Sequence, residues 1–280
     1  EVKNLFVSCG LNSIGIGSGG GVGKVTAEWL MTGHINEDIF NYDIKRFQKF
    51  HSDLGFIKDR ITESLGDLYG MHWPYKQHKT SRNVKKLPYH NELKSFGACF
   101  GVSAGYERPM WFALDGEKAE YEYSYNYQNW YPSVEYETNN TMTNVGLYDL
   151  TPFSKFEINS SSAHEELQKM CTSNIKHAIG KCTYTQMLNK DGGIETDLTV
   201  VCLDVNHFRI ISSAATRERD KFHIKKHLSD EIEVNDVTDD YCVFGLFGPK
   251  SRLLMQKLSK DDFSNENFKF VHLSSNSNSK

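Results

Sequence analysis

The sequence predicts an α+β protein, in which strands and helices both occur but do not alternate strictly. Three strand-like runs follow one another at 182–188, 198–203 and 208–212, while apolar residues recur at helical spacing over 163–170 and 217–228. Strict strand–helix–strand alternation would instead favour a parallel sheet with helices on both faces. With 280 residues, the chain is long enough for two units or one large one.

The first expected element starts from an apolar run at 5–8 and continues into a stretch with seven glycines between Gly10 and Gly23. We expect a strand, a glycine turn and then a helix that ends at Thr32 and Gly33. Glycine adopts positive φ without strain and lets backbone N–H groups approach a ligand, and a helix start adds partial positive charge. The stretch therefore indicates contact with a cofactor that has an anionic or electron-rich edge. The alternative is a turn that only lets the helix pack closely against a sheet.

Two phosphate-binding motifs are similar to this stretch, and the residues argue against both. A P-loop requires Gly and Ser/Thr at the positions that hold Ser18 and Val25 here. Gly15, Gly17 and Gly20 match the dinucleotide fingerprint, but the polar residues 34–38 after the helix do not predict the second strand that this fingerprint needs.

The middle of the chain is expected to hold helices and connecting segments. Apolar residues recur at three- and four-residue steps over 43–69, which indicates one or two amphipathic helices. The pattern fails over 69–88, which we interpret as a linking segment. The remaining expectations here are a short helix within 87–100, a packed loop over 105–112, either a strand or a tyrosine-rich extended loop over 120–130, and a helix over 133–143.

The C-terminal half is expected to contain one marked hairpin. Asp191 and Gly192 form a tight turn between two apolar strands, so the side chains near its end are expected to cluster. These side chains are Tyr184, Leu188, Glu195 and Asp197. Asp197 fits either a partly buried carboxylate that recognises an amine or an acceptor that stabilises a turn. The other expected elements are strands at 153–158, 232–237 and 241–247, a helix at 249–258 and a frayed end at 273–280.

Composition excludes several classes of function. A net charge of −4 gives no electrostatic reason to bind nucleic acid. The six cysteines contain no CxxC pair and the 11 histidines no metal-binding spacing, so we expect no metal site and free thiols in a reducing compartment. No stretch approaches the roughly 18 apolar residues of a membrane span.

Segments along the chain resemble, in consistent order, the sarcosine and dimethylglycine dehydrogenase family. Residues 7–24, followed by Ala27-Glu-Trp-Leu, are similar to the end of that family's flavin domain. Two segments resemble the family's linking region: Tyr69-Gly-Met-His-Trp-Pro and Gly105-Tyr-Glu-Arg-Pro-Met-Trp-Phe. The family also has a tetrahydrofolate-binding domain, which it shares with the aminomethyltransferase of the glycine cleavage system. Four segments resemble that domain: Asp149-Leu-Thr-Pro-Phe-Ser-Lys-Phe, Gly192-Gly-Ile-Glu-Thr-Asp-Leu-Thr-Val, Ala215-Thr-Arg and Phe247-Gly-Pro-Lys-Ser-Arg.

The resemblance implies a fold in three parts. These are the C-terminal tail of a D-amino-acid-oxidase-like FAD-binding domain at 1–34, a central linking region at 35–90, and an incomplete aminomethyltransferase-like folate-binding domain at 91–280. It also implies an internal segment of a longer protein, because the family's flavin-attaching histidine and its Tyr-Thr-Gly-Glu segment have no counterpart in the sequence. The catalytic residues are then expected outside this chain.

The same resemblance implies an FAD-dependent amine dehydrogenase that oxidises an N-methyl group of sarcosine or dimethylglycine. The one-carbon unit passes to tetrahydrofolate as 5,10-methylenetetrahydrofolate, and electrons pass to an electron-transfer flavoprotein. The implied location is the mitochondrial matrix, and the alternative is the cytoplasm. The implied FAD contacts are Asn12, Ile14, Gly15, Ile16 and Gly17. The implied folate contacts are Tyr184, Leu188, Asp197 and Ser213.

The sequence departs from the family's folate-binding pattern at two positions, and two other functions are alternatives. Thr196 precedes Asp197 where the glycine-cleavage relative has Asp-Asp, and Ser213 replaces an asparagine. Folate binding is therefore implied less firmly than flavin contact. The alternatives are a non-catalytic regulatory homologue, such as the pyruvate dehydrogenase phosphatase regulatory subunit, and a stand-alone folate-binding module.

Overall fold

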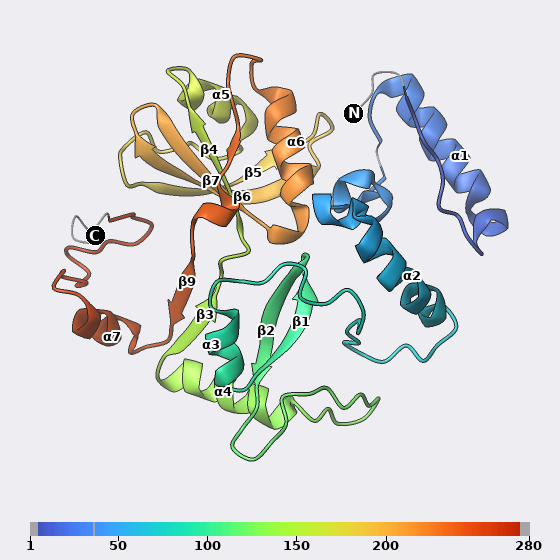
Figure 1. Ribbon diagram of the computed structural model, residues 1–280. Coiled ribbons are helices and arrows are strands. Elements are labelled where there is room, and N and C mark those ends of the chain that lie inside the picture. Colours follow the sequence, from blue (N-terminus) through green and yellow to red (C-terminus); the bar gives the residue numbers. More distant parts are fainter. Residues whose placement is uncertain (1–4, 36, 275–280) are drawn as a thin grey trace. The chain divides into compact units, whose positions relative to one another are not determined.

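The computed structural model describes residues 5–35 and 37–274, and the chain divides into two compact units, Glu1–Arg46 and Phe47–Lys280 (Figure 1). The boundary expected after residue 34 falls inside the first unit. Of the end that we expected to fray, residues 275–280 lie outside the described residues.

The first unit contains the long helix α1 (Gly15–Thr32) and two short 3-10 helices, η1 (Phe40–Tyr42) and η2 (Ile44–Arg46). The expected strand and glycine turn are wrong, because the described residues 5–8 form no strand and the glycines from Gly15 onward belong to α1. A glycine costs about 1 kcal/mol relative to alanine inside a helix, so local preference opposes this helix. The residues before the helix contact it: the Phe6 ring lies edge-on to Trp29 with centroids 5.6 Å apart. The Ser8 hydroxyl also hydrogen-bonds that of Thr26 at 2.8 Å.

The predicted end of α1 is confirmed. Gly33 has φ +74°, and its N–H donates to the Trp29 carbonyl at 2.9 Å. This left-handed C-cap satisfies a carbonyl that the helix leaves without a partner.

The second unit begins with η3 (Lys49–Ser52) and the amphipathic helix α2 (Leu54–Asp67). Asp53 caps α2 by accepting a hydrogen bond from the Phe56 N–H at 2.8 Å, which satisfies a donor of the first turn. The segment after α2 turns back beside the helix, since the N–H groups of Lys79 and Thr80 donate to the Glu63 carboxylate at 2.7 and 2.8 Å.

An antiparallel pair of strands, β1 (Ala98–Ser103) and β2 (Tyr106–Phe112), forms the next element. The loop expected over 105–112 is therefore wrong. Pro109 suggested a loop, but it lies where the register with β1 shifts, and such irregularities admit proline. The helices expected on either side are confirmed as α3 (His90–Ser95) and α4 (Tyr131–Thr143), whereas residues 120–130 form the extended loop.

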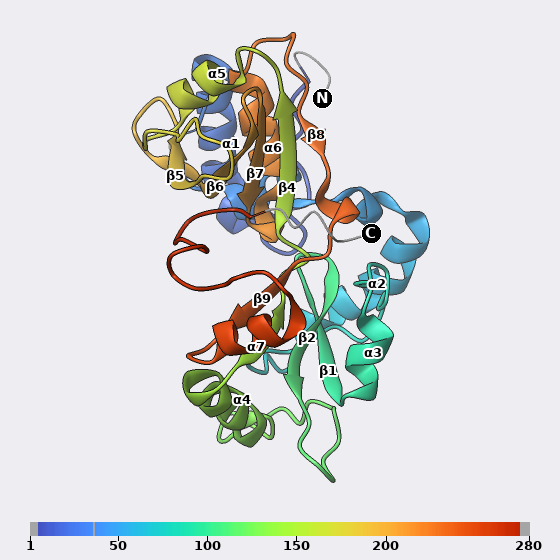
Figure 2. The ribbon, with the colours of Figure 1, turned by 90° about the vertical axis from the view of Figure 1, so that its left-hand side faces the viewer.

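Five strands form an antiparallel sheet in the order β5-β6-β7-β4-β8 within the described residues. Their bounds are β4 (Ser154–Asn159), β5 (Cys182–Leu188), β6 (Ile194–Asp204), β7 (His207–Ser212) and β8 (Asn235–Asp236). Figure 2 shows the short strand β8 beside β4, at the edge of the sheet. The predicted strands are confirmed, except that β8 covers only the middle of the run expected at 232–237.

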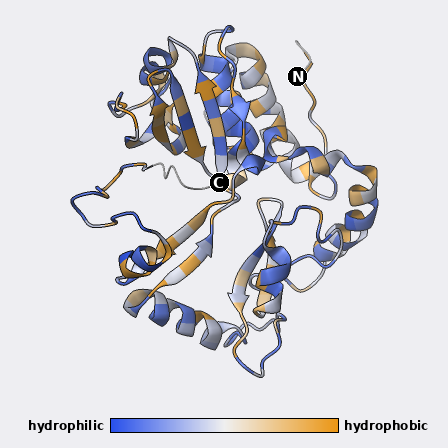
Figure 3. Ribbon diagram, turned by 60° about the vertical axis from the view of Figure 1, so that its left-hand side comes forward, coloured by the Kyte–Doolittle hydropathy of each residue, from blue (hydrophilic) through white to orange (hydrophobic). Residues whose placement is uncertain are grey.

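One face of this sheet carries the hydrophobic core. Side chains alternate along the strands, visible as changing colour in Figure 3, and Phe156, Ile158, Phe208 and Ile210 are all 0% exposed. The helices α5 (Ala163–Met170) and α6 (Arg217–His227) contribute Ala163, Leu167 and Ile224 to the same core. The opposite face is thus left for polar side chains.

The remaining elements are a two-stranded ribbon of β3 (Gly146–Asp149) and β9 (Phe244–Phe247), the 3-10 helices η4 (Ala214–Thr216) and η5 (Thr238–Asp240), and helix α7 (Ser251–Leu258). Over residues 5–35 and 37–274, the helices are too short or too polar to cross a membrane.

Candidate functional site

The hairpin between β5 and β6 is confirmed, and Asn189 organises its turn. Gly192 has φ +83°, and the Asn189 N–H donates to the Gly193 carbonyl at 2.8 Å. The Asn189 side-chain oxygen also accepts from the N–H groups of Asp191 and Gly193, at 3.0 and 2.8 Å. This turn sets the register that pairs Gln186 with Asp197.

Tyr184 and Asp197 meet on the sheet face opposite the core. The Tyr184 hydroxyl donates to Asp197 Oδ2 at 3.0 Å, and 60% of the Tyr184 side chain is exposed. Asp197 is exposed as well, so neither reading of its local sequence holds: it is not partly buried, and its partner is a tyrosine rather than a turn. Because an ionised carboxylate can accept further hydrogen bonds, this pair offers an oriented acceptor to a ligand N–H.

The other side chains expected near the hairpin have different surroundings. Leu188 lies on β5 four residues beyond Tyr184, beside the register shift near the turn. Glu195 forms an ion pair with Arg219 of α6 at 2.8 Å instead of joining Tyr184. Ser213 follows β7 and caps η4, since its hydroxyl accepts from the Ala215 N–H at 3.3 Å.

The residues expected to contact FAD lie at the start of α1, in the first unit. Ile14 is the N-cap, Gly15, Ile16 and Gly17 form the first turn, and Asn12 belongs to the turn before it. The first backbone hydrogen bond of the helix runs from the Ser18 N–H to the Ile14 carbonyl at 2.9 Å. The N–H groups before Ser18 therefore have no acceptor within the helix, and a Cβ at Gly17 would meet nothing within 4 Å. This end of α1 fits an electron-rich edge of a ligand.

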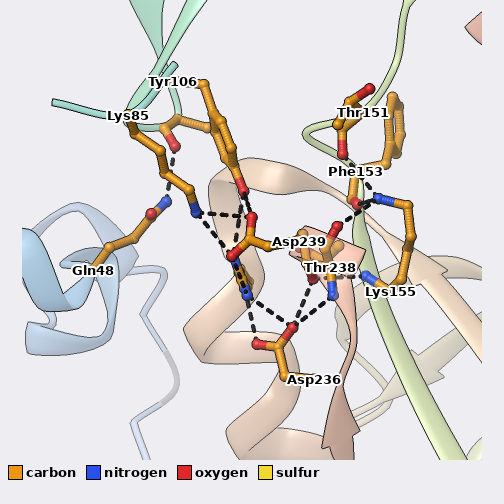
Figure 4. A network of polar contacts seen from close by, with 12 residues as sticks. Gln48, Lys85, Tyr106, Thr151, Phe153, Lys155, Asp236, Thr238 and Asp239 are labelled. Carbon is orange, nitrogen blue, oxygen red and sulfur yellow. Dashed lines mark hydrogen bonds and ion pairs between the residues drawn. The ribbon is translucent and has the colours of Figure 1, made fainter. Parts of the chain in front are cut away.

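A network of charged and polar side chains joins five segments of the second unit (Figure 4). Arg217, at the start of α6, donates two parallel hydrogen bonds to Asp236 of β8 at 2.9 and 2.8 Å. Arg217 also pairs with Asp239 of η5 at 3.3 Å. Asp239 in turn accepts from the Tyr106 hydroxyl of β2 at 3.0 Å and pairs with Lys85 at 3.3 Å.

The charges in this network stabilise one another. Burial alone would raise the pKa of Asp236, but hydrogen bonds from Arg217 and Thr238 hold that pKa below its usual value. The Asp239 side chain is more exposed, and the positive charges of Lys85 and Arg217 lower its pKa. Burial and the neighbouring Asp239 raise the pKa of Tyr106, so this phenol stays protonated. The network thus carries fixed charges at neutral pH, which fits a structural role better than proton transfer. We call Lys85, Tyr106, Arg217, Asp236 and Asp239 the joint, because they connect separate segments of the chain.

Lys155, at the start of β4, forms a second part of the joint. Its side chain is 2% exposed, and its ammonium group donates to the carbonyls of Thr151, Phe153 and Thr238 at 2.8, 2.9 and 3.1 Å (Figure 4). Burial lowers the pKa of Lys155, while three acceptors satisfy its three N–H donors. Lys155 therefore ties the segment before β4 to η5.

Sequence reasoning missed this joint, although it had singled out the segments that carry it. Tyr106 lies in Gly105-Tyr-Glu-Arg and Arg217 ends Ala215-Thr-Arg, two segments that carried the family resemblance. The two residues are 111 positions apart and the Arg217 guanidinium lies 3.3 Å from the Tyr106 hydroxyl.

Two family models match the chain in consecutive segments. The FAD dependent oxidoreductase central domain matches residues 32–86, and the GCVT N-terminal domain matches residues 89–278. A solved structure of the glycine cleavage system aminomethyltransferase T from Bartonella henselae aligns with a TM-score of 0.52 at 22% identity, over 62% of this chain and 44% of that one. The expected α+β fold with an aminomethyltransferase-like part is thus confirmed.

Curated relatives match nearly the whole chain. The 4-methylaminobutanoate oxidase (formaldehyde-forming) of Paenarthrobacter nicotinovorans is 37% identical, over 97% of this chain and 33% of the relative. The mitochondrial pyruvate dehydrogenase phosphatase regulatory subunit of Mus musculus is 30% identical, over 92% of this chain and 30% of the relative. The mitochondrial dimethylglycine dehydrogenase of Rattus norvegicus is 28% identical, over 98% of this chain and 32% of the relative. The chain therefore spans about a third of the length of the curated relatives it matches.

Proposed function

Because this chain belongs to the sarcosine and dimethylglycine dehydrogenase family, we propose that the whole protein catalyses oxidative N-demethylation of a small N-methylated amino acid with FAD. Sarcosine and dimethylglycine are the substrates we expect. The family resemblance further suggests an electron-transfer flavoprotein as electron acceptor. Mitochondrial relatives suggest the mitochondrial matrix as location.

One observation carries the proposal: the oxidoreductase central domain at 32–86 is followed directly by the GCVT domain at 89–278. The first domain belongs to redox enzymes that use FAD, and the second has the fold of a one-carbon transfer protein. Their union in one chain supports a reaction that removes a one-carbon unit by oxidation and then hands it on.

The start of α1 would support the flavin. FAD, when bound, supplies the hydride acceptor for oxidation of the N-methyl group. Asn12, Ile14, Gly15, Ile16 and Gly17 would hold its electron-rich edge. Backbone N–H groups and the positive end of the helix stabilise negative charge at such an edge without having to reorient. These glycines would therefore keep side chains away from the N–H groups of the first turn.

The exposed face of the hairpin would hold tetrahydrofolate. Asp197 would accept a hydrogen bond from a folate N–H, and the Tyr184 hydroxyl, 3.0 Å from Oδ2, would keep the carboxylate in place. Leu188 would contribute apolar contact beside the turn, and Ser213 would lie at the end of β7. In this proposal the one-carbon unit leaves as 5,10-methylenetetrahydrofolate, and without folate it leaves as formaldehyde.

Anaerobic reduction of the whole protein tests the proposal. The protein is mixed with sarcosine, dimethylglycine or 4-methylaminobutanoate, and the flavin absorbance is followed with and without tetrahydrofolate. We expect bleaching by at least one of the glycine derivatives and conversion of tetrahydrofolate to its methylene form. A flavin that none of the three amines reduces would remove the proposed activity. Bleaching by 4-methylaminobutanoate alone would keep the reaction class and change the substrate.

A regulatory role is the second candidate, because the regulatory subunit from Mus musculus is 30% identical, slightly more than the dehydrogenase from Rattus norvegicus. In that case the whole protein would change the activity of a phosphatase, and no amine would reduce a flavin in the whole protein. Measuring phosphatase activity with and without the protein separates the two functions.

A further inference from the structure

We propose that Glu63, Asp67 and His78 form a binding site for a divalent first-row metal cation, with Zn²⁺ as the best fit. The site lies in the second unit, at the C-terminal end of α2 and in the segment that follows it (Figure 1). It is independent of the proposed oxidation, because its residues are separate from the expected FAD and folate contacts.

Helix geometry and backbone hydrogen bonds bring the three side chains together. Glu63 and Asp67 are four residues apart on α2, so they project from the same side of the helix. The returning chain is held against that side by the N–H groups of Lys79 and Thr80, which donate to Glu63 at 2.7 and 2.8 Å. His78 immediately precedes these two anchors and is thereby fixed opposite the carboxylates.

The separations of the donor atoms suit a shared cation better than direct hydrogen bonds. His78 Nδ1 lies 3.5 Å from Asp67 Oδ2 and 3.9 Å from Glu63 Oε1. These distances exceed the 2.7–3.2 Å of an N–H···O hydrogen bond. Two ligands of a tetrahedral zinc ion, each bonded at roughly 2.1 Å, lie about 3.4 Å apart. The three donor atoms all lie within 4.8 Å of one another, which leaves room for one ion and for water in the remaining position.

The Nδ1 atom of His78 lacks a hydrogen-bond partner among the described residues, which favours a bound ligand. Nδ1 of His78 is shielded from solvent and makes no hydrogen bond to any described residue, although the rest of the side chain is 43% exposed. A buried nitrogen without a hydrogen bond is costly, and a metal ion would satisfy it.

The local charges favour a cation of this class. Two carboxylates face one ammonium group, because Lys76 pairs with Asp67 Oδ1 and leaves Oδ2 toward His78. Magnesium and calcium prefer oxygen ligands only, whereas an imidazole with two carboxylates suits zinc and its neighbours.

Thermal unfolding and calorimetric titration of the full chain, stripped of metal with EDTA, test this proposal. We expect ZnCl₂ to bind with a stoichiometry near one and to raise the Tm, whereas MgCl₂ at the same concentration leaves the Tm unchanged. The variant His78→Ala should bind zinc at least tenfold more weakly and lose the Tm increase. Asp67→Asn is a second variant that keeps the side-chain shape and should weaken zinc binding in the same direction.

The control is His227→Ala, because His223 and His227 are four residues apart on α6 and offer a competing pair of imidazoles. Zinc binding that survives in His227→Ala and is lost in His78→Ala supports the proposal. The reverse pattern, or equal zinc affinity in His78→Ala and the parent chain, overturns it. Circular dichroism of each metal-free variant shows whether the fold is retained, and none of these measurements depends on amine oxidation.

Discussion

Tyr184 donates a hydrogen bond of 3.0 Å to Asp197 across the paired strands β5 and β6, on the sheet face that α5 and α6 leave uncovered. The two side chains are neighbours because the turn at Asn189 sets the register of the hairpin. An exposed hydrogen bond contributes little to stability, and in the proposed function this one orients the carboxylate for tetrahydrofolate.

Replacing Asp197 by alanine should separate oxidation from capture of the one-carbon unit. In the whole protein, Asp197→Ala should leave flavin reduction by the amine unchanged, because the proposed FAD contacts lie elsewhere. Loss of a hydrogen bond to a charged group should weaken tetrahydrofolate binding by about tenfold or more. Free formaldehyde, measured against methylenetetrahydrofolate, should therefore increase. Asp204→Ala, at the far end of the same strand, is the control. An unchanged product ratio in Asp197→Ala would contradict the assigned folate face.

Replacing Arg217 should destabilise the second unit strongly. Its side chain is 12% exposed, and its removal would leave the buried carboxylate of Asp236 without its bidentate partner. Breaking such a pair costs about 3–5 kcal/mol in the free energy of unfolding, which urea denaturation measures. Lys169→Ala removes a surface ion pair from a side chain that is 68% exposed and should cost less than about 1 kcal/mol. Equal effects of the two variants would show that the network adds little.

The pH dependence of stability should include the titration of His223. Burial and the neighbouring His227 lower the pKa of His223 from 6.5 to about 4. A lowered pKa means that the unfolded chain binds the proton more readily, so the stabilisation is fully present above pH 6.5 and is lost as the pH falls toward 4. His223→Gln should flatten the curve of unfolding free energy against pH in this window. His164→Gln is the comparison, and a steep curve that persists in His223→Gln would reject the assignment.

The hairpin between β1 and β2 should tolerate no side chain at Gly105. The residue has φ +81°, and a Cβ there would lie 2.8 Å from the Phe50 ring. Gly105→Ala should therefore combine a backbone cost of about 1–2 kcal/mol with a packing cost of about 1–3 kcal/mol. Gly116→Ala isolates the backbone cost, because Gly116 has φ +86° and open space around it. Chemical denaturation of both variants measures the difference, and a smaller loss in Gly105→Ala than in Gly116→Ala would be the contrary result.

Local pattern predicted the elements whose side chains alternate or repeat clearly. The strands around Phe156, Phe208 and Leu198 carry apolar residues at every second position, because the hydrophobic core lies on one face of their sheet. The helix from Ala163 to Met170 was predicted for the same kind of reason, since a single stripe of apolar residues faces the core.

Two elements were mispredicted because the structure departs from the local preference of their residues. The glycines of α1 disfavour a helix, yet Phe6 and Ser8 pack on Trp29 and Thr26 of that helix. Pro109 suggests a loop, yet the register shift in β1 accommodates it within β2. The joint around Arg217 was beyond prediction for a related reason: its members are scattered over residues 85–239, and only the fold brings them together.

The joint also determines how the second unit can open. Tyr106 on β2 contacts both Arg217 on α6 and Asp239 on η5, so separating the hairpin β1-β2 from the five-stranded sheet leaves the buried Tyr106 hydroxyl without these two partners. Opening at this point therefore costs the hydrogen bonds of a buried hydroxyl. We therefore expect amide hydrogens of β2 and β7 to exchange with solvent at similar opening free energies, as in a single cooperative folding unit.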